Sequence, residues 1–128
     1  MLKPKSNVPY TRTEIQGMRK GELQSYLPQN GFIIRAGCFT IEKMNPDAPF
    51  VIQVGNAPKV VAKAELLRQQ PDTVFPVFLK EKCSDRHYFF EGNFRFSSLS
   101  KARTLIAAAE DRSGRHGELA YVLRLQRV

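Results

Sequence analysis

Two β-like segments lie so close together in the chain that they restrict the topology of the whole sheet. Residues 73–80 are the most β-like run in the sequence, and residues 88–97 largely alternate apolar and polar side chains. Only the polar residues 81–87 separate them. A parallel crossover needs roughly a dozen residues or more, so these two strands must pair as an antiparallel hairpin. An all-parallel sheet is therefore excluded.

Two residues inside this hairpin indicate irregular pairing. Pro76 lacks an N–H group, which predicts an edge position or a bulge. Gly92 interrupts the second strand and predicts a bulge or a close backbone approach. Apart from the glycine, the even positions of that strand are all aromatic and are predicted to form one apolar face: Tyr88, Phe90, Phe94 and Phe96.

Three helices and three further strands are predicted outside the hairpin. One helix follows the capping-box pattern Thr11 to Glu14, a second covers residues 59–70, and a third covers residues 101–111 with Ser100 as its N-cap. The other strands are predicted at 32–41, 50–54 and 119–127. Residues 32–41 are apolar on both faces, as in a strand that is covered on both sides.

The order of these elements predicts an α+β fold. We expect a curled mixed β-sheet or pseudo-barrel of about five strands with about three helices. The length of 128 residues corresponds to one domain, which we place at residues 11–128. Residues 1–10 are expected to form a flexible basic arm, because Pro4 and Pro9 disfavour helix and little there can pack.

The charge balance predicts a polyanionic partner. The chain has 20 Lys and Arg against 12 Asp and Glu, a net charge of +8 and a pI near 9.8. A surplus of this size gives a positive surface potential, which is typical of nucleic-acid binders. No apolar run reaches the roughly 18 residues of a membrane span, and residues 1–10 lack the apolar core of a secretion signal. We therefore expect a cytoplasmic protein with no membrane partner.

Basic residues cluster near the N-terminus, around residues 80–95 and in the loop that holds Arg112 and Arg115. A basic arm beside a basic hairpin would suit a nucleic-acid backbone. The residues predicted to contact nucleic acid are Arg19, Arg35, Lys80, Lys82, Arg86 and Arg95.

The sequence contains no strong catalytic pattern. Position 78, two residues before Lys80, is Phe and not the carboxylate of a metal-dependent nuclease motif. Phosphate-binding glycine loops are absent, and the two cysteines and two histidines lack the paired spacings of a zinc site. We predict no cofactor, no metal and no catalysis. The alternative is a small nucleic-acid hydrolase with His87 and Asp85 as its acid–base pair.

Several motifs between residues 11 and 98 resemble those of PUA-like domains. They include the strand Pro76-Val77-Phe78 and the segment Phe90-Glu91-Gly92-Asn93-Phe94-Arg95-Phe96, preceded by Arg12-Thr13-Glu14-Ile15, Gln24 to Pro28, Asn45-Pro46-Asp47 and Val54-Gly55-Asn56. The chain is similar in particular to the SRA-like modified-base readers of modification-dependent restriction enzymes.

This resemblance implies a barrel-like sheet that binds DNA or RNA, in some members with one base flipped into a pocket. A flipped base needs an aromatic ring to stack on and a polar group to read its edge. The candidates for that pocket are Tyr26, Phe39, Asp47 and Tyr88.

The expected function is therefore that of a nucleic-acid-binding domain, with DNA as the first candidate and RNA as the second. Unlike those restriction enzymes, this chain is expected to have no attached nuclease, so a separate nuclease or effector protein is a further expected partner. The alternative of another class is a protein-interaction module of a phage or defence system, which would use the Pro76 edge and apolar turn residues.

Overall fold

The computed structural model describes residues 3–128 and has an α+β fold. Met1 and Leu2 of the predicted arm lie outside the described residues. The helices are α1 (Arg12–Arg19), α2 (Pro58–Arg68) and α3 (Arg103–Ser113). The strands are β1 (Pro9–Tyr10), β2 (Gln29–Asn30), β3 (Ile33–Ile34), β4 (Gly37–Thr40), β5 (Val51–Gly55), β6 (Phe75–Lys80), β7 (Tyr88–Ser100) and β8 (Leu119–Arg127).

Six of these strands form one mixed, curled sheet, as predicted. Its order is β4-β6-β7-β8-β5, and β1 pairs with β7 beside this path. The β4–β6 pair is parallel and the others are antiparallel. The pseudo-barrel alternative is wrong, because β4 and β5 end the path and do not pair with each other in the described chain. The strand beyond the predicted five is β1, which comes from the end of the predicted arm.

The β6–β7 hairpin is antiparallel as predicted, and it carries a β-bulge. Val77 pairs with Gly92, whereas the next residue, Phe78, pairs with Phe90. Glu91 is therefore the extra residue, as the glycine beside it indicated. Pro76, however, does not mark an edge, because β6 lies between β4 and β7. The β4 pairing begins only at Val77, after the proline.

The bulge reverses the faces on which the aromatic residues of β7 lie. Before it, Tyr88 and Phe90 pack with Phe78 on one face of the sheet. After it, Phe94 lies on the opposite face in the main core with Phe75. The prediction that the even positions share one apolar face is therefore wrong, because one unpaired residue shifts the two-residue alternation by one position.

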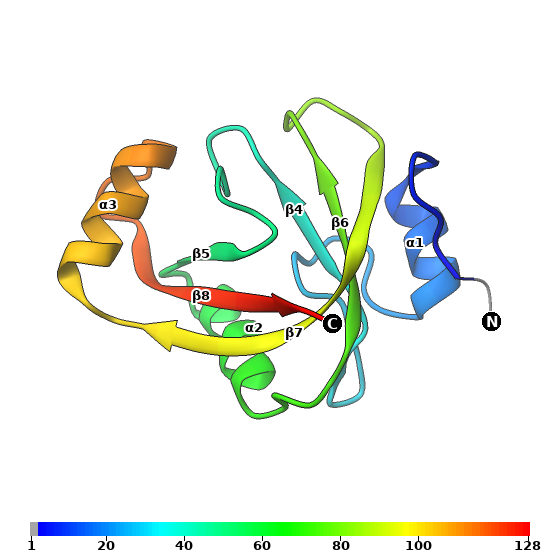
Figure 1. Cartoon of the computed structure of the whole chain (residues 1–128), viewed down its shortest axis with the longest axis horizontal. Coiled ribbons are helices and arrows are strands. Elements are labelled where there is room, and N and C mark those ends of the chain that lie inside the picture. The colour runs from blue at the N-terminus through cyan, green and yellow to red at the C-terminus, as the bar shows by residue number, and fades with distance from the viewer. Residues whose placement is uncertain (1–2) are drawn as a thin grey trace.

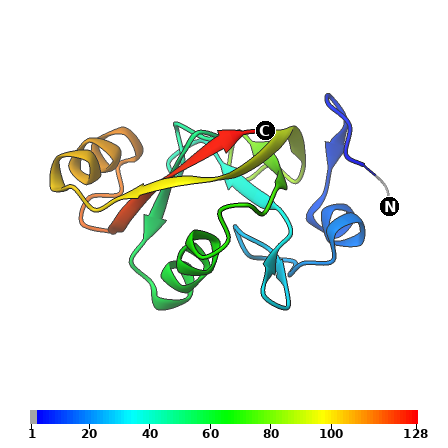
Figure 2. The ribbon, with the colours of Figure 1, turned by 60° about the horizontal axis from the view of Figure 1, so that its bottom comes forward.

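Both faces of the sheet are covered. Helix α2 packs against one face of the sheet (Figure 2). This face holds the main core, in which Ala64 and Leu67 are fully buried. Helices α1 and α3 cover the other face at opposite ends of the sheet (Figure 1). Cys38 and Phe39 show this two-sided burial within β4, since they are consecutive and belong to different clusters.

Helix α1 begins with the predicted capping box. The Thr11 side chain accepts a hydrogen bond from the Glu14 N–H, and the Glu14 carboxylate accepts one from the Thr11 N–H at 2.9 Å. The prediction that Ser100 caps α3 is wrong by two residues, because Ala102 is the N-cap. The Ser100 hydroxyl accepts a hydrogen bond from the Ala102 N–H instead.

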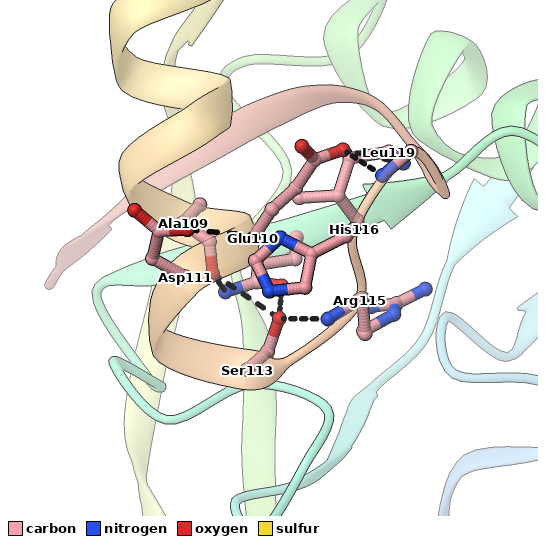
Figure 3. Close-up of polar contacts among 9 residues, drawn as sticks. Ala109, Glu110, Asp111, Ser113, Arg115, His116 and Leu119 are labelled. Atoms are coloured by element: carbon pink, nitrogen blue, oxygen red, sulfur yellow. Dashed lines mark hydrogen bonds and ion pairs between the residues drawn. The ribbon is translucent and has the colours of Figure 1, made fainter.

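A buried polar network fixes the C-terminal end of α3 (Figure 3). The Ser113 hydroxyl donates to the Gln53 side chain at 2.6 Å, and the Gln53 amide donates to the Ala109 carbonyl. The Glu110 carboxylate accepts from the Gly117 N–H, which orders the loop before β8. The polar groups at this end of the sheet therefore serve the fold.

We expect Gly92→Ala to destabilise the protein by about 1–3 kcal/mol. Gly92 has a φ of +138°, which residues with a side chain rarely adopt, and a Cβ there would also require the flexible Arg127 guanidinium to shift. The matched control is Gly17→Ala in α1, where an added Cβ meets nothing within 4 Å. That change should be neutral or stabilise by about 0.5–1 kcal/mol. Urea unfolding of both variants measures the difference, and equal effects would contradict this role of the bulge.

Candidate nucleic-acid interface

The loop between β6 and β7, residues 81–87, forms one wall of a basic hollow, and the start of α1 forms another wall. The hollow has a volume of about 430 Å³. Three cationic side chains line it, those of Arg12, Lys80 and Arg86, and no Asp or Glu does. Its other lining residues are Thr11, Thr13, Leu23, Gln24 and Tyr88. This is a concentration of positive charge that no carboxylate of the wall offsets.

Tyr88 holds two of these cations in place. The Lys80 Nζ lies 5.1 Å from the centroid of the Tyr88 ring, and the Arg12 Cζ lies 5.9 Å from it. Both distances suit cation–π attraction. The ring is itself buried, with 7% exposure, so it cannot stack on a base. Tyr88 therefore orients the charges of the hollow and does not read its ligand.

Internal hydrogen bonds preorganise the loop. The Lys80 ammonium donates to the carbonyls of Cys83 and Asp85, each at 3.2 Å. The Asp85 carboxylate accepts from the Lys82 N–H at 2.9 Å. Arg86 has no hydrogen bond or ion pair within residues 3–128, and its exposed guanidinium remains available for a ligand.

The Arg12 guanidinium makes a hydrogen bond through one of its nitrogens and leaves another without a partner among the described residues. Its Nη2 donates to the Glu22 carbonyl at 3.1 Å. Its Nε is buried and has no hydrogen-bond partner among the described residues. A buried donor without an acceptor is costly, and no carboxylate lies within ion-pair distance of this guanidinium in residues 3–128. Arg12 therefore adds an uncompensated charge to the hollow.

A second hollow lies on the other side of the same loop. It has a volume of about 480 Å³ and shares Lys80 and Arg86 with the first. Its chemistry differs, because apolar and acidic groups supply most of its lining. The remaining lining residues are Ile41, Leu79, Glu81, Asp85, His87, Phe89 and Glu91.

The structure brings only some of the predicted contact residues together. Lys80 and Arg86 converge in the basic hollow, and Lys82 lies on the same exposed loop. Arg95 is exposed further along β7. Arg12, which was not among the predicted contacts, joins the site because α1 packs against the hairpin. No local pattern reveals this approach, which depends on the tertiary fold.

Arg19 and Arg35 lie apart from this site and tie α1 to the segment before β4. The Arg19 Nε donates to the Arg35 carbonyl at 2.8 Å, and the Arg35 Nε donates to the Arg19 carbonyl at 3.1 Å. Burial, and secondly the neighbouring charge of Arg35, lowers the pKa of the Arg19 guanidinium. These contacts give both arginines a structural role.

The four residues predicted to form a base pocket are dispersed. Phe39 is 1% exposed within the main core, because alternation along β4 turns it inward. The Tyr26 hydroxyl donates to the Val60 carbonyl at 2.7 Å, and Asp47 forms an ion pair with Arg112 at 2.5 Å. Of the four, only Tyr88 lines the basic hollow.

The hydrolase alternative gains no support from the geometry of its two residues. The Asp85 carboxylate accepts a hydrogen bond from the Lys82 N–H within the loop. No hydrogen bond or ion pair joins His87 to Asp85 in the part of the chain that the structure describes. Within residues 3–128, no group of three or more His, Cys, Asp or Glu side chains is placed to hold a metal ion.

Comparisons with known proteins leave the family open. No family model matches the sequence, and neither a curated protein nor a solved structure matches it significantly. The PUA-like resemblance therefore remains a prediction. None of the helices in residues 3–128 has the length and apolar character required to cross a membrane.

The reactivity of the two cysteines should show that the loop is exposed and that β4 is buried. Cys83 is exposed, whereas Cys38 is buried and its pKa is raised by that burial to about 12. At pH 8, Cys38 therefore stays protonated as well as covered, and only a thiolate reacts rapidly. We expect iodoacetamide to alkylate one thiol in the native protein, two after denaturation, and none in native Cys83→Ser, as counted by mass spectrometry. Rapid labelling of Cys38 in the native state would contradict the burial of β4.

Proposed function

We propose that this protein is a nucleic-acid-binding domain without catalysis of its own, and that the basic hollow contacts phosphates. The observation that carries the proposal is the convergence of Arg12, Lys80 and Arg86 in a hollow that no carboxylate lines. The net charge of +8 supports it, because the whole surface attracts a polyanion. DNA is the first candidate ligand and RNA the second.

Phosphate fits the hollow better than a base does. The exposed Arg86 guanidinium can offer parallel N–H donors to phosphate oxygens, and Arg12 and the Lys80 ammonium add positive charge beside it. The Tyr88 ring is covered by its cations and offers no stacking surface. Contacts of this kind give affinity and register without reading sequence.

The proposal does not include the modified-base pocket that the sequence predicted. Tyr26, Phe39 and Asp47 are engaged elsewhere in the fold. The PUA-like resemblance supports nucleic-acid binding in general, and the basic hollow supplies the specific surface.

A second candidate function is that of a protein-interaction module. Phe32, at the tip of the β2–β3 hairpin, is 84% exposed, and the adjacent Ile33 is 46% exposed. A separate nuclease or effector protein could dock on this apolar tip. Affinity capture with wild type and Phe32→Ser tests it: a partner that survives nuclease treatment and is lost with the variant supports this function.

We expect Arg86→Gln to weaken binding to duplex DNA and to reduce the salt dependence of that binding. Loss of one phosphate contact should lower the log–log salt slope by about 0.9. Arg103→Gln is the matched control, because this arginine is also exposed but belongs to α3 at the other end of the sheet (Figure 1). Fluorescence anisotropy between 50 and 200 mM salt, about the range in which phosphate contacts dominate, measures both slopes.

The control variant distinguishes binding at the basic hollow from binding through the net charge of the whole protein. If Arg86→Gln alone lowers the slope, the hollow binds phosphate. If both substitutions lower the slope equally, the affinity arises from net charge and the hollow has no special role. If wild-type protein binds neither DNA nor RNA at low salt, the proposed function is wrong.

A further inference from the structure

We propose that the hollow around Phe89 binds an unpaired base, so that the protein prefers single-stranded over duplex nucleic acid; this rests on the proposed function. Phe89 is 46% exposed although it lies within a sheet strand. It lines the second hollow beside the basic loop. An aromatic ring exposed next to phosphate-binding cations is the usual surface for stacking a base from a single strand.

The lining of this hollow suits a base and not a phosphate. Ile41 and Leu79 provide apolar surface beside the Phe89 ring. The three carboxylates of Glu81, Asp85 and Glu91 would repel a phosphate group. The basic hollow across the loop has no carboxylate in its lining. The basic hollow therefore suits the phosphate of a nucleotide, and the hollow around Phe89 suits its base.

The two hollows lie on opposite faces of the hairpin end. Tyr88 and Phe89 are consecutive on β7, so their side chains point to opposite sides of the sheet. Strand β1 pairs with both residues and covers this edge of β7. A ligand that reaches both hollows must therefore pass over the exposed loop of residues 81–87, where Lys80 and Arg86 line both sides.

The stiffness of the ligand then determines what can bind. Duplex DNA has a persistence length of about 150 base pairs, so it cannot bend around one hairpin loop, and its bases are already stacked on each other. A single strand can bend sharply there and can direct a base onto Phe89 while a nearby phosphate contacts Arg86. Duplex DNA can reach only the basic hollow.

Phe89→Leu tests the proposal, because leucine keeps the apolar contact with the sheet but cannot stack on a base. We expect it to weaken binding of a short single-stranded oligonucleotide about ten-fold and to leave binding of the matching duplex unchanged. Phe89→Tyr retains the ring and should bind the single strand as wild type does. Phe32→Leu removes another exposed aromatic residue and should change neither affinity.

Arg86→Gln in the same anisotropy experiment separates the two proposals. It should weaken binding of both the single strand and the duplex. If it does so while Phe89→Leu has no effect, or while Phe89→Leu weakens both ligands equally, the base site is overturned and phosphate binding stands. If Arg86→Gln changes neither affinity, the proposal that the basic hollow binds phosphate is wrong, and the base site that rests on it is overturned with it. Thermal unfolding verifies that Phe89→Leu remains folded.

Discussion

The bulge at Glu91 in the β6–β7 hairpin determines which face of the sheet each aromatic side chain of β7 occupies. One unpaired residue turns Tyr88 and Phe90 to the face that α1 covers, and leaves Phe94 in the main core on the other face. Without it, Tyr88, Phe90, Phe94 and Phe96 would all lie on one side of the sheet. Tyr88 and Phe90 could then not belong to the cluster around Ile15 of α1 while Phe94 lies in the main core.

The same strand determines the chemistry at the hairpin end. Tyr88 is buried beneath two cations, whereas its neighbour Phe89 is exposed on the opposite face. Two consecutive residues thus separate a cationic hollow from one with an exposed aromatic ring, and Arg86 lines both. The arrangement needs no catalytic group, because binding by charge and stacking depends only on positions that the fold already fixes.

The sequence alone predicted features that depend on local physics. The capping box of α1, the antiparallel hairpin, the bulge at Gly92 and strand β8 follow from residues close in the chain. Features that depend on distant contacts were not predictable. Arg12 approaches Lys80 only through the packing of α1, and Phe39 is no base-pocket residue because both faces of β4 are covered by distant parts of the chain. The central position of β6 in the sheet was not predictable either, because it results from the pairing with β4 and no local pattern places β4 beside β6.

We propose that the end of the β6–β7 hairpin around residues 81–87, and not the general surface charge, is where this protein meets nucleic acid. A ¹⁵N chemical-shift titration with a short single-stranded oligonucleotide tests it most directly, because every amide reports separately. We expect the largest shifts at residues 11–13 and 80–89, on both sides of the loop. Equal shifts at α3 and at these residues, or shifts confined to α3, would contradict it.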